Sequence, residues 1–130
     1  MRAALWPDAD PAALTQEAVA YLDGTSQMIA AAWITTDGLG FIELSIRPFS
    51  DGCDSMPVPH VEGWYVEPAA RGQSVGRALL AAAEEWCRAK GFMELASDSE
   101  LANTGSLRAH AACGFQEVDR LVKFRKILRQ

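Results

Sequence analysis

The chain has little basic charge for its size. Its 130 residues include 12 Lys and Arg against 17 Asp and Glu, which gives a formal net charge of −5. Binding to nucleic acid depends on a basic surface, so this balance argues against a nucleic-acid partner. The same acidity is compatible with a cationic ligand.

Cysteine and histidine are also scarce. The three cysteines, Cys53, Cys87 and Cys113, are an odd number and form no CxxC pair. We therefore expect reduced thiols in a cytoplasmic protein, with packing roles for the cysteines rather than nucleophilic ones. The two histidines, His60 and His110, lie far apart in sequence without accompanying ligands, so no metal site is predicted.

Long apolar runs are missing as well. No segment approaches the roughly 18 apolar residues of a membrane-spanning helix, and the N-terminal MRAALWPDADP has no signal-peptide core. We therefore expect no membrane partner. Apolar residues make up 49% and charged residues 22% of the chain, as in ordinary globular proteins. Residues 1–130 are expected to form a single domain.

Apolar periodicity and turn residues predict an alternation of helices and strands. Helices are expected over residues 10–23, 74–90 and 104–113, and strands over residues 27–35, 40–49, 61–67, 92–97 and 115–128. A strand–helix–strand unit crosses over right-handedly, so the strands on either side of the middle helix should be parallel or splayed neighbours. The expected fold is a single α/β domain, with a mixed, mainly antiparallel sheet flanked by helices on both faces.

The stretch from Val61 to Leu80, VEGWYVEPAARGQSVGRALL, combines a strand, a loop and the start of a helix. Such a turn directs backbone N–H groups and the positive end of the helix dipole toward one point. This arrangement favours the binding of a phosphate group.

The same stretch resembles the central motif of the GCN5-related N-acetyltransferases (GNAT). Further motifs resemble the aminoglycoside 6'-N-acetyltransferases of bacterial resistance, namely LWPD, DGCDSMPV, VEGWYV and ASDSE…N…S…H…CGF. Several spaced motifs in the same order are more specific than a glycine-rich loop alone. The resemblance implies a GNAT fold, acetyl-CoA as co-substrate, no metal and a homodimer. It also implies direct transfer of acetyl to the 6'-amine of an aminoglycoside.

The resemblance assigns substrate roles to five side chains. Glu62 would be a substrate ligand and a base that acts through water, because the attacking amine must be neutral. Asp98 and Asp119 match acidic positions that bind substrate amines, and Trp6 and Phe49 match aromatic positions beside the sugar. Simpler roles stay open for each of them: a solvated strand residue, a turn or capping residue, or a core aromatic.

The resemblance also assigns the cofactor contacts. The backbone of Trp64, Tyr65 and Val66 would pair with the pantetheine arm as an added strand does. Asn103 would reach the cofactor as well as cap its helix. The loop that would hold the pyrophosphate consists of Arg71, Gly72, Gln73, Ser74, Val75 and Gly76.

The chain departs from the family pattern in three places. Ser74 replaces the most characteristic glycine of the loop; a positive φ there would cost about 1 kcal/mol, which the hydroxyl could offset by capping the helix or by binding phosphate. Lys123 stands where a tyrosine often protonates the leaving thiolate, so no general acid is assigned. The usual first strand is expected to be missing.

Two other functions remain compatible with the sequence. One is an acetyltransferase that acts on another small amine or on a protein amine. The other is a non-catalytic domain that binds an aminoglycoside or CoA, as the changes at Ser74 and Lys123 suggest. Release of free thiol from acetyl-CoA would separate these hypotheses.

Overall fold

A computed structural model describes residues 1–129 and shows one four-stranded sheet. The strands, in their order across the sheet, are β1 (Ala31–Ile34), β2 (Gly40–Arg47), β3 (Val58–Val66) and β4 (Ala96–Ser97). The first two neighbouring pairs are antiparallel, and β3 with β4 is parallel. The predicted mixed, mainly antiparallel sheet is confirmed.

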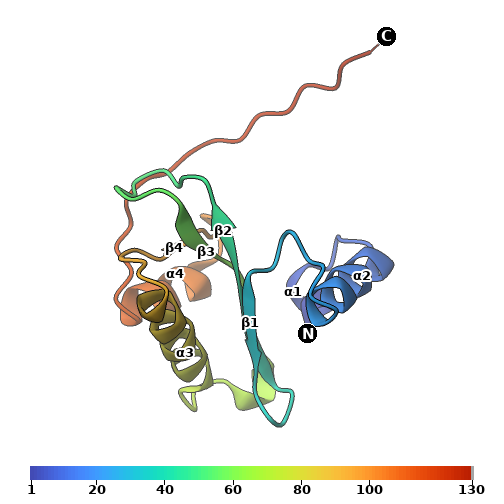
Figure 1. Ribbon diagram of the computed structural model, residues 1–130, viewed down its shortest axis with the longest axis vertical. Helices are drawn as coiled ribbons and strands as arrows, with labels where there is room; N and C mark the ends of the chain where they lie inside the picture. The colour runs from blue at the N-terminus through green and yellow to red at the C-terminus, as the bar shows by residue number, and fades with distance from the viewer. Residues whose placement is uncertain (130) are drawn as a thin grey trace.

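Helices cover both faces of the sheet, as predicted. They are α1 (Arg2–Leu5), α2 (Pro11–Leu22), the 3-10 turn η1 (Pro68–Ala70), α3 (Val75–Ala89) and α4 (Thr104–Ala112). Figure 1 shows α1 and α2 on one side of the strands and α3 and α4 on the other. Of these elements, α1 was not predicted; four residues are too few to show a helical period.

Local capping explains why the helix bounds could be predicted to within one or two residues. The Asp10 side chain accepts a hydrogen bond from the Ala12 N–H at 3.1 Å, and this fixes the start of α2. Gly91 follows α3 with a φ of +86°, the left-handed conformation that ends many helices.

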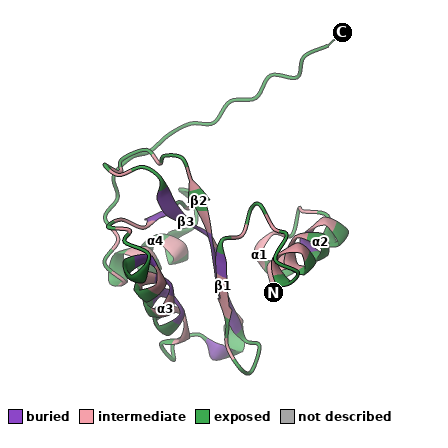
Figure 2. Ribbon diagram, viewed as in Figure 1, coloured by how far each residue is buried: buried purple, intermediate pink, exposed green. Residues whose placement is uncertain are grey.

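The core lies between the sheet and α3. Its buried side chains are Ile42, Leu44, Val61, Leu79, Leu80, Ala83 and Cys87. Figure 2 shows these buried positions on the strands and on α3. Trp33 and Trp86 pack edge to face beside them, with ring centroids 6.2 Å apart, and extend the contact from α3 to β1.

The predicted last strand over residues 115–128 is wrong. Residues 115–129, called the tail below, contain neither helix nor strand, and their outer part extends away from the body (Figure 1). Alternating apolar residues give a strand tendency, but a strand also needs a neighbour. The edge strand β4 has only two residues, so it offers few backbone groups with which a further strand could pair. From Val118 onward the apolar side chains of the tail are exposed, Phe124 to 93%.

The N-terminal region contributes helices and leaves β1 at an edge of the sheet. Residues 1–30 contain α1 and α2 and no strand. The side of β1 that faces away from β2 therefore has no strand partner in residues 1–129. Within this described part of the chain, no helix combines the length and the apolarity needed to cross a membrane.

Candidate active site around Glu62

A β-bulge in β3 places Glu62. Glu43 of β2 pairs with Gly63 of β3, whereas the next residue, Leu44, pairs with Val61. Glu62 is therefore the extra residue of the bulged strand, a position where the side chain is turned out of the regular alternation. The bulge gives a local structural reason for a carboxylate in the middle of an otherwise apolar strand.

Gly63 leaves the space that an aromatic side chain fills beside the bulge. A Cβ at Gly63 would lie 2.8 Å from the Trp6 ring, closer than packed atoms approach. Trp6 also packs edge to face on Phe41, with ring centroids 6.4 Å apart. The Arg2 guanidinium lies 5.0 Å from the Trp6 ring centroid. Trp6 is thereby held against Gly63, the residue after Glu62 in β3, while its contact with a sugar stays a prediction.

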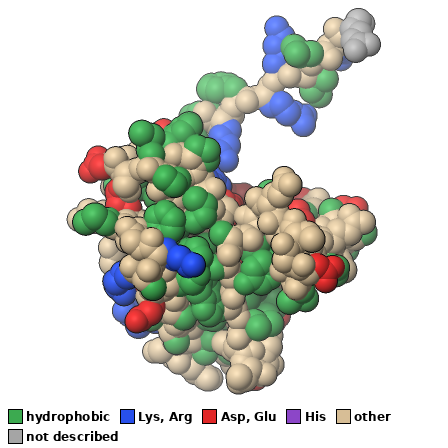
Figure 3. All heavy atoms as spheres, viewed as in Figure 1, with side chains coloured by type: hydrophobic (Ala, Val, Ile, Leu, Met, Phe, Trp, Pro, Cys, Tyr) green, Lys and Arg blue, Asp and Glu red, His purple; other side chains and the backbone are tan. Residues whose placement is uncertain are grey.

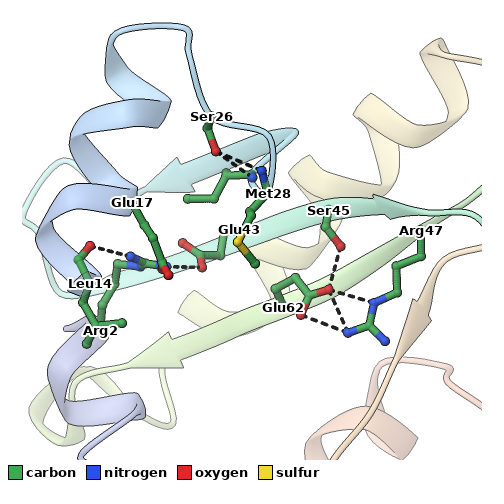
Figure 4. A network of polar contacts seen from close by, with 10 residues as sticks. Arg2, Leu14, Glu17, Ser26, Met28, Glu43, Ser45, Arg47 and Glu62 are labelled. Atoms are coloured by element: carbon green, nitrogen blue, oxygen red, sulfur yellow. Dashed lines mark hydrogen bonds and ion pairs between the residues drawn. The ribbon is translucent and has the colours of Figure 1, made fainter. Parts of the chain in front are cut away.

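The Glu62 carboxylate is bound by two neighbours on β2. Ser45 donates a hydrogen bond to Oε1 at 2.6 Å, and Arg47 donates to both oxygens, at 2.9 and 3.1 Å. Figure 4 shows both side chains converging on Glu62. The Glu62 side chain is 34% exposed, so it is neither a core residue nor a freely solvated one. An incoming ammonium group would compete with Arg47 for it.

A buried histidine joins Glu62 to Asp98. The His60 side chain is 2% exposed; its Nδ1 lies 3.4 Å from Glu62 Oε1 and its Nε2 lies 3.5 Å from Asp98 Oδ2. Strand alternation puts residues 60 and 62 toward the same face. The register of His60 with Ala96 and of Val61 with Ser97 then brings Asp98 level with Glu62.

The charges around Asp98 favour its ionised form. The neighbouring His60 imidazole is the main reason that the pKa of the Asp98 carboxyl lies below its ordinary value, and the positive charges of Arg47 and Lys123 add to the effect. The Asp98 side chain is 66% exposed. It therefore presents a negative charge that a cationic ligand can reach.

A second buried carboxylate lies behind the site. Glu43 is 4% exposed and accepts a hydrogen bond from Arg2 at 3.0 Å, while Arg2 also pairs with Glu17 at 2.8 Å (Figure 4). Burial raises the pKa of Glu43, and the bond to Arg2 opposes that rise. This pair connects α1 to β2 and supports the position of Trp6.

Two predicted substrate residues lie farther from this cluster. Phe49 follows the end of β2 and is 63% exposed. Asp119 lies on the tail, where its carboxylate accepts a hydrogen bond from the Arg120 N–H at 2.8 Å. Their contacts with a ligand stay predictions.

The strands β3 and β4 are paired only before the residues that are predicted to pair with the pantetheine arm, Trp64, Tyr65 and Val66. Their pairing ends at Val61 and Ser97, so the edge of β3 along Trp64–Val66 has no β4 neighbour. The Trp64 indole N–H donates to the Gly76 carbonyl at 3.0 Å, and Arg71 Nε donates to the Val66 carbonyl at 2.8 Å. These bonds hold the open strand edge next to the start of α3.

The loop before α3 has free donors and a strained residue. Within residues 1–129, the first N–H of this helix with a backbone acceptor is that of Ala78, at 3.0 Å from Ser74 O; the preceding N–H groups remain for a ligand. Ser74 has a φ of 63°, which confirms the predicted strain. Its hydroxyl makes no capping bond to α3, so the expected offset by capping is wrong. A Cβ atom added at Gly72, in the same loop, would have no heavy atom within 4 Å, so the space beside this residue is open.

The amide of Asn103 caps α4. Its side chain accepts a hydrogen bond from the Ser106 N–H at 3.1 Å, which confirms the predicted cap, while contact with the cofactor stays a prediction. His110 of the same helix lies 2.7 Å from Ser97 Oγ and packs on Trp64, with ring centroids 5.3 Å apart. Among the described residues, His, Cys, Asp and Glu side chains form no cluster suited to a metal ion.

Sequence reasoning missed three side chains of this cluster: Ser45, Arg47 and His60. Ser45 and Arg47 reach Glu62 from the paired strand β2, and His60 reaches it from the same strand, β3. One signal was present in the sequence, because His60 stands two residues before Glu62 on the same strand. No local pattern revealed that Ser45 and Arg47 would lie opposite.

Comparison with known proteins places the chain beside acetyltransferases. The model of the acetyltransferase (GNAT) family matches residues 2–115. An aminoglycoside N(6')-acetyltransferase type 1 from Klebsiella aerogenes is 46% identical, over 98% of this chain and 87% of the relative. One from Stenotrophomonas maltophilia is 44% identical, over 96% and 82%.

Solved structures agree with these relatives. AAC(6')-Iy in complex with the bisubstrate analogue CoA-S-monomethyl-acetylneamine superposes with a TM-score of 0.87 and 36% identity, over 98% of this chain and 88% of that one. The apo aminoglycoside 6'-N-acetyltransferase AAC(6')-IG from Acinetobacter haemolyticus gives a TM-score of 0.79 and 31% identity, over 93% and 84%.

Proposed function

The chain belongs to the GNAT acetyltransferase family, and we propose that it transfers the acetyl group of acetyl-CoA to the 6'-amine of aminoglycosides. One observation carries the proposal: Glu62 and Asp98 flank a single buried histidine next to the open edge of β3. Relatives at up to 46% identity over nearly the whole chain bear this activity in their names. A polycationic acceptor matches two carboxylates of this kind.

Glu62 binds the acceptor amine and takes up its proton. Direct transfer forms a bond between the amine nitrogen and the acetyl carbon and breaks the carbon–sulfur bond. CoA leaves as its thiolate, which takes a proton from solvent, and the amine proton passes through water to Glu62. Arg47 must share or release the carboxylate first, because it occupies both oxygens. An ammonium group of the substrate supplies the replacing charge.

Asp98 and the aromatic residues orient the acceptor. Asp98 is ionised and accessible, so it can hold a second ammonium group of the same molecule. Trp6 beside the bulge, together with Phe49, covers a sugar ring. Asp119 adds a further carboxylate from the tail.

Acetyl-CoA supplies the activated acetyl group and binds on the other side of β3. The open backbone edge of Trp64, Tyr65 and Val66 receives the pantetheine arm. The free N–H groups of residues 72 to 77 receive the pyrophosphate. Asn103 at the start of α4 contributes a further polar contact.

The protein is a homodimer in this proposal. The tail is apolar and basic: residues 115–129 hold five basic and two acidic side chains, whereas residues 1–114 hold seven basic and fifteen acidic ones. Figure 3 shows the blue and green side chains of the tail standing away from the body. An acidic second copy complements this charge and can cover the exposed apolar side chains.

A cytoplasmic location fits the side-chain chemistry. Cys53, Cys87 and Cys113 are all free thiols, the state that a reducing compartment maintains. Burial raises the pKa of Cys87, which lowers its reactivity as a nucleophile.

Thiol release from acetyl-CoA tests the proposal. Kanamycin and tobramycin should each release CoA thiol and gain one acetyl group by mass spectrometry. Paromomycin, which carries a hydroxyl at the 6' position, is the matched control and should be inactive at that position. Turnover with lysine peptides alone would indicate a protein acetyltransferase. Acetyl-CoA binding without turnover on any amine would indicate a non-catalytic domain.

A further inference from the structure

We propose that His60 is a positioning residue for the acetyl transfer, which holds Glu62 and Asp98 in one fixed arrangement. The inference rests on the proposed function and names a side chain that this function did not require. His60 is 2% exposed and lies on β3, two residues before Glu62. It is one of two buried polar or charged side chains in the described chain, with Glu43.

The geometry of the ring gives each nitrogen its own carboxylate. Nδ1 faces Glu62 Oε1 at 3.4 Å, and Nε2 faces Asp98 Oδ2 at 3.5 Å. Within residues 1–129, Nδ1 is buried without a hydrogen-bond partner, and a small approach of Glu62 would supply one. Because the nitrogens point in different directions, the two carboxylates do not converge on one point.

The protonation of the ring decides how many carboxylates it binds. A neutral imidazole donates one hydrogen bond, whereas an imidazolium ion donates two. Glu62 and Asp98 face the ring as negative charges, and Arg47 and Lys123 are the positive charges close to the same cluster. The ring lies between the two carboxylates, so it fixes their spacing, and the ammonium groups of a substrate meet a prearranged pair.

Burial restricts the His60 ring to one orientation. A side chain that is 2% exposed cannot turn toward solvent, so the ring keeps one orientation between its two partners. Glu62 lies on β3 and Asp98 follows the last residue of β4, and the parallel contact of these two strands spans only two residue pairs. The His60 ring therefore adds a side-chain link to a short strand contact.

Three substitutions at His60 separate its two contacts. His60→Phe keeps a ring in the core and removes both nitrogens. His60→Gln keeps a donor close to the position of Nε2, which faces Asp98; His60→Asn keeps one close to Nδ1, which faces Glu62. Glu84→Gln, which removes an exposed pair with Arg88 on α3, is the control variant.

Steady-state kinetics with kanamycin and acetyl-CoA should resolve the two contacts. We expect His60→Phe to lower kcat/KM for kanamycin by about tenfold to a hundredfold, the usual effect of losing hydrogen bonds to charged groups. We expect His60→Gln to recover the KM for kanamycin and His60→Asn to recover kcat. The KM for acetyl-CoA and the melting temperature should stay close to those of Glu84→Gln.

Other results would overturn the inference. Equal kinetic constants for the three His60 variants and the wild type would show that the contacts are incidental. Equal losses in all three variants, together with lower melting temperatures, would show a purely structural role. If the wild type releases no thiol with any aminoglycoside, the proposed function itself fails and the role of His60 falls with it.

Discussion

At the scale of single residues, Ser74 carries backbone strain in the loop where we propose that the pyrophosphate of acetyl-CoA binds. Its φ of 63° lies in the left-handed region, where a side chain crowds the backbone carbonyl. Its hydroxyl makes no capping bond to α3. The strain is thus uncompensated in the ligand-free protein.

Ser74→Gly should stabilise the protein and tighten its complex with acetyl-CoA. Glycine adopts a positive φ without strain, so the free energy of unfolding should rise by about 1 kcal/mol. Urea unfolding and isothermal titration with acetyl-CoA measure the two effects. A weaker acetyl-CoA complex of a stabilised variant would show that the Ser74 hydroxyl contacts the phosphate.

Glu62→Gln should reduce turnover much more than stability. The substitution removes the proton acceptor, and general-base catalysis is worth about a hundredfold to ten-thousandfold in rate. Arg47 is 40% exposed, so water can solvate it when its partner becomes neutral. The kcat with kanamycin and the melting temperature should be measured together. An unchanged kcat would remove Glu62 from the mechanism.

At the scale of elements, one carboxylate anchors the loop between β2 and β3. Glu94 accepts hydrogen bonds from the backbone N–H groups of Asp54 and Ser55, at 2.9 and 2.6 Å. The Ser55 side chain and backbone bonds are the main reasons that the pKa of Glu94 lies below its ordinary value. These bonds tie the DGCDSMPV loop to the segment before β4.

Acid should loosen this loop before the rest of the fold. A carboxyl whose pKa is lowered by folding stabilises the folded state above its unfolded pKa, and this contribution is lost as the pH falls through the folded pKa. The protection factors of the Asp54 and Ser55 amides, which compare their exchange rates with those of an unfolded peptide at the same pH, should therefore fall when the pH drops below the ordinary Glu value of 4.5. Glu94→Gln should show fast exchange already at neutral pH; protected amides in that variant would contradict the assignment.

Elements with local signals could be predicted from the sequence, and those set by distant pairing could not. The helix 75–89 has its stop signal close by in the sequence, because Gly91 follows it by two residues. The tail has the alternating pattern of a strand but pairs with no other strand in residues 1–129. Likewise the motif around Glu62 drew attention to this carboxylate, although its catalytic role stays a prediction. Arg47 contacts Glu62 only because of the register between β2 and β3, and Asp98 lies near His60 because β4 pairs with β3.

At the scale of the whole molecule, charge and apolar surface are divided unevenly between body and tail. The tail carries five of the twelve basic side chains. Its side chains Leu121, Val122, Phe124, Ile127 and Leu128 are between 57% and 93% exposed. A molecule with such a segment gains by association, since apolar area is removed from water at about 25 cal/mol per Å².

If the protein is the proposed homodimer, replacing both Phe124 and Ile127 with Asp should convert it to a monomer. The two charges make burial of the tail unfavourable and oppose the acidic body of a second copy. Light scattering after gel filtration should show half the mass of the wild type. Leu22→Asp is the matched control, because Leu22 is 80% exposed on α2, and its mass should equal that of the wild type. A monomeric wild type, or an unchanged mass of the double variant, would contradict the proposal.

The bulge at Glu62 makes β3 sensitive to length as well as to composition. Deletion of Glu62 itself would leave Val61 opposite Leu44 and Gly63 opposite Glu43 in a regular ladder, so the neighbours would keep their faces and only the carboxylate would be lost. An insertion or deletion at any other position of the strand would make the side chains beyond it exchange faces; an insertion after Gly63, for example, would turn Trp64 away from α3. Variant libraries of this strand should therefore accept many substitutions yet almost no insertions or deletions, so that new acceptor specificities arise from changed side chains on a strand of fixed length.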